Sequence, residues 1–212
     1  MHAVVVAGSL PAGELDRAFL EAADVLVAVD GGADALARIG LVPSLLVGDL
    51  DSISPAALRD LESRGVEVLT LPIAKDETDT EAALRVAIDR GATDITVFNA
   101  LGGPRLDHLL GNVLVLTAPW LAPVRVKLAD GLHEVFLAKG DSAVAGRPGD
   151  IVSLLPLTST VEDVRTEGLL YPLRGEPLVQ GQTRGVSNEM TGAKARVTHG
   201  PGALLLIHYQ GR

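Results

Sequence analysis

Short runs of β-branched and other apolar residues alternate with helix-compatible segments through the first half of the chain. This alternation is typical of a parallel sheet covered by helices, because parallel strands need a crossover segment between them. The expected strands are Ala3 to Ala7, Val25 to Val29, Leu45 to Val47, Val66 to Leu69, Asp94 to Phe98 and Val124 to Leu128. The expected helices are Glu14 to Ala23, Ala33 to Ile39, Pro55 to Ser63, Thr80 to Arg90 and Leu106 to Thr117. Ser54 before Pro55 suits a helix start, and Gly40, Gly65 and Gly91 stand where helices commonly end.

The second half of the chain has a different texture. From about Val135, short strand-like runs are separated by Gly, Pro and Asp, with no long helical pattern, which indicates an all-β unit. The expected strands there are Asp150 to Leu154, Val161 to Thr166, Ala193 to Thr198 and Ala203 to Tyr209. We therefore expect two domains, an α/β domain over residues 1–134 and an all-β domain over residues 135–212.

The composition excludes several classes of function. The chain has no cysteine, so disulfides, thiolate metal sites and a thiol nucleophile are ruled out, and oxygen ligands remain the main metal chemistry. A formal charge of −9 disfavours a broad nucleic-acid surface. Hydrophobic residues make up 47%, yet no run approaches the roughly 18 that a membrane helix needs, and the start of the chain lacks a charged leader. We expect a soluble, cytoplasmic protein without a nucleic-acid or membrane partner.

Acidic and glycine-rich motifs follow directly after several expected strands. Asp30 comes after Val29, Gly48 comes after Val47, and the Leu101 glycine turn comes after the strand that ends at Phe98. The carboxyl ends of parallel strands meet at one edge of the sheet, where ligands bind in open α/β folds. These motifs therefore predict a single site at that edge.

Asp49 and Asp51 are the first candidate metal ligands. Two acids one residue apart on an extended segment project to the same side and can reach one Mg²⁺, whose preferred ligands are oxygens. The alternative is a helix cap, since Asp51 or Ser52 can accept from backbone N–H groups ahead of the next helix. The neighbouring acids favour the metal, and phosphoryl-group chemistry with it.

Asp76 and Asp79 form the second acidic run. Thr78 and Glu81 have the spacing of a capping box, which accounts for acids in a first helical turn. A cap does not explain why two aspartates crowd one turn beside Lys75, because like charges repel unless a cation offsets them. We therefore expect a functional role for Asp79.

Three further motifs carry polar groups in turns. Gly31 and Gly32 would let backbone approach a ligand closely, although a tight strand-to-helix turn explains them equally well. Arg105 could grip phosphate oxygens, or form a surface pair with Asp107, and His108 follows them. In the β half, Ser187 and Asn188 could orient a small polar ligand or make an ordinary turn.

Taken together, these motifs resemble the thiamine pyrophosphokinase family over almost the whole chain. The resemblance rests on six segments in order, which are residues 30–34, 48–52, 76–79, the Leu101–His108 turn with Asn112, residues 168–173 and residues 187–189. It implies an α/β catalytic domain that binds ATP and Mg²⁺, followed by a β-sandwich that binds thiamine and forms a homodimer. The implied reaction transfers pyrophosphate from ATP to the hydroxyl of thiamine, giving thiamine diphosphate and AMP.

The resemblance also implies roles for individual residues. Asp49, Asp51 and Asp79 would be the Mg²⁺ ligands and catalytic acids, with Asp79 or Asp51 as the general base. The ATP-binding set would be Asp30, Gly31, Gly32, Asp76, Arg105, Asp107, His108 and Asn112, and the thiamine-binding set would be Ser187 and Asn188. Pro104 departs from the Gly-Gly-Arg pattern of the family and can shift Arg105, and the last strand lacks a tryptophan to face the thiamine ring.

Two other functions are compatible with the same residues. A pyrophosphokinase that acts on a pterin alcohol would use the same metal and phosphate chemistry, because the residues facing the acceptor are the least diagnostic. A sensor that binds nucleotide or thiamine without turnover is the alternative from a different class.

Overall fold

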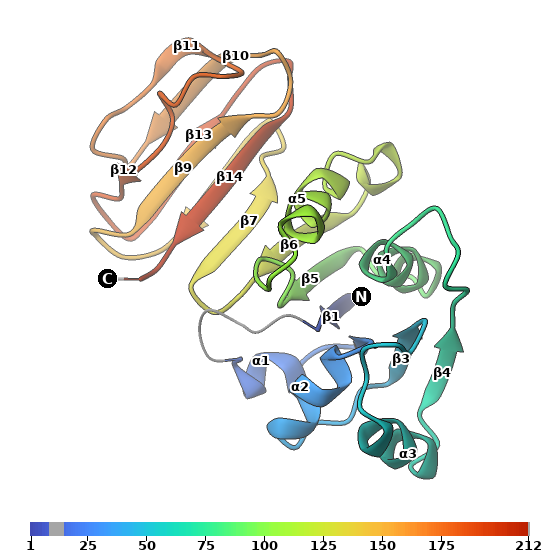
Figure 1. Cartoon of the computed structure of the whole chain (residues 1–212). Coiled ribbons are helices and arrows are strands. Elements are labelled where there is room, and N and C mark those ends of the chain that lie inside the picture. Colours follow the sequence, from blue (N-terminus) through green and yellow to red (C-terminus); the bar gives the residue numbers. More distant parts are fainter. Residues whose placement is uncertain (9–14, 212) are drawn as a thin grey trace. The chain divides into compact units, whose positions relative to one another are not determined.

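A computed structural model describes residues 1–8 and 15–211. The chain divides into two compact units, Met1–Gly131 and Leu132–Arg212. The predicted domain boundary lay three residues later, between residues 134 and 135. Figure 1 shows the helices in the first unit and a strand-rich second unit.

The first unit contains a parallel sheet of the predicted kind. Its strands are β1 (His2–Val6), β2 (Val25–Val29), β3 (Leu45–Gly48), β4 (Glu67–Thr70), β5 (Asp94–Phe98) and β6 (Arg125–Ala129). Their order across the sheet is β6-β5-β1-β2-β3-β4, and each neighbouring pair is parallel. The chain starts at β1, steps to β4 on one side and returns to β5 on the other. The carboxyl ends of β1 and β5 therefore flank a topological switch point, where open α/β sheets bind ligands.

The helices cover both faces of this sheet. They are α1 (Arg17–Glu21), α2 (Gly32–Arg38), α3 (Pro55–Ser63), α4 (Asp79–Asp89) and α5 (Leu106–Val115), with a short 3₁₀ turn at Pro119–Leu121. The core of Val4, Val6, Ala28 and Leu46 buries Leu20, Leu36 and Leu61 from the first three helices. Helix α4 lies on the opposite face of the sheet (Figure 1), and its Leu84 is fully buried. Burial of each such leucine contributes roughly 1.5–3 kcal/mol.

Side-chain caps define where these helices begin. The Ser54 hydroxyl accepts from the N–H of Ala57 at 3.2 Å, as predicted, with Pro55 in the first turn. The Thr78 hydroxyl accepts from the N–H of Glu81 at 3.2 Å and starts α4. Asp16 caps α1, so that helix starts after the predicted start at Glu14, which lies outside the described residues.

The second unit consists of two antiparallel sheets around one core. The sheets are β12-β9-β14-β7 and β11-β10-β13-β8. Their strands are β7 (His133–Leu137), β8 (Asp141–Ala145), β9 (Ile151–Pro156), β10 (Thr160–Glu167), β11 (Arg174–Val179), β12 (Asn188–Glu189), β13 (Lys194–Thr198) and β14 (Leu204–Tyr209). Val152, Leu154, Val161, Val197 and Leu206 of both sheets form its buried centre. The predicted fold class, an α/β domain followed by an all-β sandwich, is confirmed.

Within the described residues, no helix is both long enough and apolar enough to cross a membrane.

Candidate functional site

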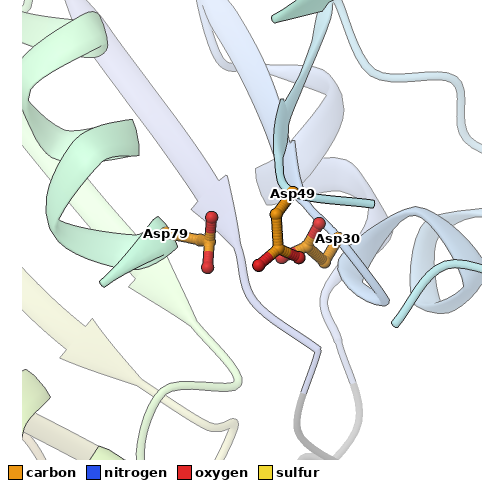
Figure 2. A group of neighbouring side chains, drawn as sticks. All are labelled: Asp30, Asp49 and Asp79. Carbon is orange, nitrogen blue, oxygen red and sulfur yellow. The ribbon is translucent and has the colours of Figure 1, made fainter. Parts of the chain in front are cut away.

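Three aspartates from separate segments converge at the carboxyl edge of the parallel sheet. Asp30 follows β2, Asp49 follows β3, and Asp79 is the first residue of α4. One oxygen from each carboxylate lies within 4.8 Å of the others, and Figure 2 shows the three side chains turned toward one another. The two strand ends and the helix start bring together residues that are far apart in the sequence.

Glycine at position 48 is what allows Asp30 to reach this group. A Cβ at Gly48 would lie 1.9 Å from Asp30 Oδ1, so any other residue would displace the carboxylate. Asp30 Oδ1 also accepts a hydrogen bond of 2.9 Å from the N–H of Leu50. The carboxylate is therefore fixed in place from two sides.

Burial raises the pKa of Asp30 from 3.8 to about 6, because desolvation disfavours its charged form. The hydrogen bond from Leu50 opposes this change, while the charges of Asp79, Asp49 and Asp51 add to it. Asp30 is only 8% exposed. A bound cation would relieve this unfavourable charge.

Lys75 is the cation nearest to the group. Its Nζ lies 2.9 Å from Asp79 Oδ1 and 3.7 Å from Asp49 Oδ2, and the lysine side chain is 13% exposed. Partial burial opposes the charged ammonium, but the close pairing with Asp79 and the charges of Asp49 and Asp30 outweigh it and raise the pKa of Lys75. From the sequence, Lys75 was noted only as part of a crowded turn. It lies outside α4, three residues before the capping Thr78, so helical spacing gave no signal for its contact with Asp79.

The donor set fits a hard divalent cation. Three carboxylates offer one oxygen each, which leaves positions for water and phosphate around an ion such as Mg²⁺. Asp79 Oδ1 is buried and, within the described part of the chain, has no hydrogen bond of normal geometry, so its contact with Lys75 is an ion pair only. An oxygen buried in this state is suited to a metal.

Asp51 and Asp76 stand outside this group of three carboxylates. The segment after β3 is not extended as expected, because Leu50 has a φ of 66°. The N–H of Asp51 donates to Asp49 Oδ1 at 3.2 Å, and Asp51 Oδ1 accepts from the Ser52 hydroxyl at 2.6 Å. Asp51 and Asp76 are both exposed. The reasoning that an extended segment would turn Asp49 and Asp51 to the same side is therefore wrong.

The two glycines after Asp30 allow close packing of backbone. A Cβ at Gly32 would lie 1.9 Å from the carbonyl oxygen of Val6, so α2 can begin directly against the end of β1. A Cβ at Gly31 would lie 3.2 Å from the carbonyl oxygen of Ser52. Both glycines therefore set how closely the loops of the site approach one another.

Arg105 and Asp107 form the exposed surface pair that was the alternative to phosphate binding. Arg105 donates to both oxygens of Asp107, at 2.9 and 2.6 Å, which lowers the pKa of Asp107 and raises that of Arg105. His108 is also exposed. Asn112 is buried on the same helix and donates to the carbonyl of Ala100 at 3.0 Å. Asn112 thus holds the glycine turn, while the first three residues remain accessible.

Asn188 lines a cavity of about 480 Å³ in the second unit. The lining consists of Leu154, Leu170, Tyr171, Pro172, Leu173, Arg174, Glu176, Arg184, Gly185, Val186 and Asn188. The amide of Asn188 accepts from the N–H of Tyr171 at 3.0 Å and donates to its carbonyl at 2.7 Å. Ser187 is exposed and donates its N–H to the Ser153 hydroxyl at 2.9 Å. The predicted amide is therefore engaged in holding Tyr171, whose side chain is 68% exposed.

Asn99 directly follows β5 at the switch point and was not among the predicted site residues. It is 1% exposed and has a φ of 60°. Neither atom of its amide has a hydrogen-bond partner among the residues that the structure describes. Asn is one of the few side chains that adopt this left-handed conformation readily, which is the signal that its sequence position offered.

Comparisons with known proteins all point to one family. Residues 17–128 match the family model "Thiamin pyrophosphokinase, catalytic domain", and residues 141–202 match "Thiamin pyrophosphokinase, vitamin B1 binding domain". A thiamine pyrophosphokinase of Bacillus subtilis is 26% identical over 183 residues, covering 85% of each chain. The crystal structure of a thiamine pyrophosphokinase from Bacillus subtilis superposes with a TM-score of 0.88 at 25% identity over 100% of both chains. That of the thiamin pyrophosphokinase from Geobacillus thermodenitrificans gives 0.85 at 28% identity, covering 99% of this chain and 98% of the other.

Proposed function

Because the chain belongs to the thiamin pyrophosphokinase family, we propose that Asp30, Asp49 and Asp79 together hold the Mg²⁺ that accompanies ATP. The protein is a transferase that forms thiamine diphosphate by pyrophosphoryl transfer from ATP to thiamine. The observation that carries the proposal is the approach of three carboxylate oxygens to within 4.8 Å at one sheet edge. This set replaces Asp51 of the predicted metal ligands with Asp30.

The three ligands are held ready for the ion. Asp30 is fixed by the N–H of Leu50, and Asp79 is fixed at the capped start of α4. The reaction demands positioning and charge neutralisation more than covalent chemistry, and the bound ion supplies the neutralisation for the phosphates. The protein therefore needs no nucleophilic side chain.

Asp51 is our candidate for the general base. Asp79 belongs to the proposed ligand set, whereas Asp51 lies two residues from Asp49 and keeps an exposed carboxylate. A carboxylate beside the ion but not bound to it is free to accept the proton of the thiamine hydroxyl. General base catalysis typically contributes about 10² to 10⁴ in rate.

Arg105 is proposed to bind ATP by leaving Asp107 and pairing with a phosphate group instead. The side chains of Arg105 and Asp107 are 65% and 63% exposed, and such surface pairs contribute only about 0–1 kcal/mol to stability. A phosphate accepts the same two parallel N–H groups with a larger charge. His108 is the next residue along the chain after Asp107. Asn112 stabilises the preceding glycine turn through its hydrogen bond to the carbonyl of Ala100.

The cavity of the second unit is proposed to take the thiamine ring. Tyr171 supplies an exposed aromatic face, and leucines supply apolar walls. A cationic ring is attracted to the face of an aromatic side chain. Tyr171 would thus provide the aromatic contact for which the last strand has no tryptophan, with Asn188 acting through its hold on Tyr171 and Ser187 at the rim.

We propose that the protein works as a homodimer in which the thiamine-binding cavity of one subunit serves the aspartates of its partner. Mixing Asp49→Asn protein with Tyr171→Ala protein tests this, because mixed dimers would contain one intact site. Turnover that returns on mixing supports a shared site. If the two variants exchange subunits and stay inactive, each site lies within one chain.

A cytoplasmic location is a further prediction.

The first experiment measures AMP release from ATP and Mg²⁺ with and without thiamine. We expect AMP only with thiamine, in step with thiamine diphosphate. Asp49→Asn should lose Mn²⁺ binding and turnover, whereas Asp51→Asn should keep Mn²⁺ binding and lose turnover by about 10² to 10⁴. Asp60→Asn is the matched control, because Asp60 pairs with Arg64 on the exposed surface of α3. Full turnover in Asp49→Asn would overturn the proposed metal site.

A further inference from the structure

We propose that Lys75 is a built-in counter-ion that holds the aspartates together before metal binding, competes with the metal for them, and moves to the phosphates of ATP when the metal arrives. The inference rests on the proposed function, because it concerns the same three carboxylates. It assigns a part in the reaction to a residue that is neither a metal ligand nor a candidate base.

The ammonium group of Lys75 already occupies the position of a cation. Its Nζ lies 2.9 Å from Asp79 Oδ1 and 3.7 Å from Asp49 Oδ2, and it donates to the carbonyl of Pro72 at 3.2 Å. One N–H of the ammonium is thus used by a hydrogen bond to Pro72, while the charge of the group faces two carboxylates as ion pairs. Both carboxylates belong to the proposed metal ligands.

This contact differs from an ordinary pair on a helix surface. The side chains of Lys75, Asp49 and Asp79 are 13%, 12% and 23% exposed, whereas Arg17 and Glu21, also four residues apart, are 55% and 49% exposed. Partly buried charges interact more strongly than exposed surface charges and are screened less by salt. Lys75 therefore has a substantial effect on whatever else binds these aspartates.

Mg²⁺ and Lys75 cannot both keep Asp79 as a close partner without strong repulsion. A magnesium ion binds an oxygen at about 2.0–2.1 Å, so an ammonium 2.9 Å from the same oxygen would lie within about 5 Å of the ion. The ion brings two positive charges next to one. Lys75 must then withdraw, and the phosphates that arrive with the ion are the anions available to it.

The loop that carries Lys75 is fixed at its two ends, which lets the side chain move while the backbone stays in place. The N–H of Leu71 donates to the carbonyl of Gly48 at 2.8 Å, and Thr78 caps α4. Between them, Pro72 and Ile73 are exposed and pack against little. The exchange therefore requires only rotation of a long side chain.

Mn²⁺ binding without nucleotide, followed by electron paramagnetic resonance, tests the competition directly. Lys75→Met keeps most of the unbranched apolar stem and removes the charge, so we expect it to bind Mn²⁺ about tenfold or more tightly than the wild type. In EDTA its melting temperature should fall, and Mn²⁺ should raise it by more than in the wild type. Arg64→Met, which breaks an exposed pair on α3, should leave both measurements unchanged. The KM for ATP should rise in Lys75→Met but not in Arg64→Met.

The outcomes separate this inference from the metal site itself. Unchanged or weaker Mn²⁺ binding in Lys75→Met, with wild-type binding that Asp49→Asn abolishes, overturns the counter-ion and leaves the metal site standing. No Mn²⁺ binding in either the wild type or Lys75→Met overturns both. If Lys75→Met does not fold, Lys75→Gln provides the same comparison with a polar side chain.

Discussion

Asp30 is a residue at which function and stability are opposed. Its pKa is raised by burial from 3.8 to about 6, so the folded protein binds this proton more tightly than the unfolded chain does. As pH rises from about 4 to about 6, the free energy of unfolding therefore falls. Above that range the folded protein bears the full cost of burying a charged carboxylate at Asp30. The difference corresponds to at most about 3 kcal/mol.

Asp30→Asn should remove that cost. The amide oxygen can still accept from the N–H of Leu50, while no charge is buried. In EDTA at pH 8, we expect a higher melting temperature for the variant than for the wild type, and a smaller difference at pH 4. Mn²⁺ should stabilise only the wild type. The account would be contradicted if the gain in melting temperature of the variant over the wild type were smaller at pH 8 than at pH 4.

Asn99 offers a second test at the scale of one residue. Its amide is buried and has no hydrogen-bond partner among residues 1–8 and 15–211, and each such group costs about 1–3 kcal/mol. Asn99→Gly removes the amide and adopts the φ of 60° freely, whereas Asn99→Ala removes it but strains the backbone by about 1–2 kcal/mol. Urea unfolding should therefore rank Asn99→Gly above Asn99→Ala. Equal stabilities would show that the left-handed conformation is not retained.

The individual site residues were predictable to different degrees. Asp30 and Asp49 were candidates because acids after parallel strands meet at one sheet edge, and Asp79 was a candidate because of the acidic run at a helix start. The separation of Asp51 could not, because it depends on a left-handed conformation at Leu50, and leucine gives no signal for one. The role of Lys75 depends on the folding of a loop that carries no regular pattern.

At the scale of elements, α2 and α3 are joined through one serine. Ser54 donates its N–H and its hydroxyl to the carboxylate of Asp34, at 2.9 and 2.6 Å, and its hydroxyl also caps α3. The loop that carries Asp49 is therefore tied to α2 at its far end, as Asp30 ties it at Leu50.

Ser54→Ala should weaken both the cap and this link. Loss of the cap alone costs about 0.5–2 kcal/mol, and Asp34 then loses a hydroxyl partner as well. We expect a lower midpoint of urea unfolding and weaker Mn²⁺ binding, because the loop of Asp49 is less firmly held. Ser63→Ala, at the other end of α3, is the control. Mn²⁺ affinity equal to that of the wild type would show that the loop is held without Ser54.

The same scale explains which elements the sequence could predict. The strands and helices of the first unit agree with their periodic patterns to within a few residues. Strands β7, β8, β11 and β12 were missed. β11 contains Gly175 and Pro177 and lies at a sheet edge, where proline is tolerated, and β12 has only two residues. β8 is rich in alanine and serine, so its strand conformation comes from pairing with β13 and not from local propensity.

At the scale of the whole molecule, one buried titratable group in each unit acts in the same direction. In the second unit His208 is fully buried, with Nε2 3.2 Å from Asp150 Oδ2. Burial opposes its charged ring, but the nearby carboxylates of Glu134, 3.9 Å from Nδ1, and of Asp150 outweigh it and raise the pKa of His208 above 6.5. This contribution to stability is fully present below pH 6.5 and is lost as pH rises through the folded pKa.

The metal-free protein should therefore lose stability steadily from mildly acidic to mildly alkaline pH, first through Asp30 and then through His208. Exposed carboxylates whose pKa is lowered by arginines, such as Asp107 and Asp141, act in the opposite sense, but only below their ordinary value of 3.8. Calorimetry in EDTA between pH 5 and pH 8.5 should show a falling melting temperature. Mg²⁺ should flatten the curve above about pH 6, because the ion binds the deprotonated aspartates. The double variant Asp30→Asn with His208→Gln should be flatter without metal, since neither group then takes up a proton on folding. A wild-type melting temperature that rises across this range would show that other groups control the pH dependence.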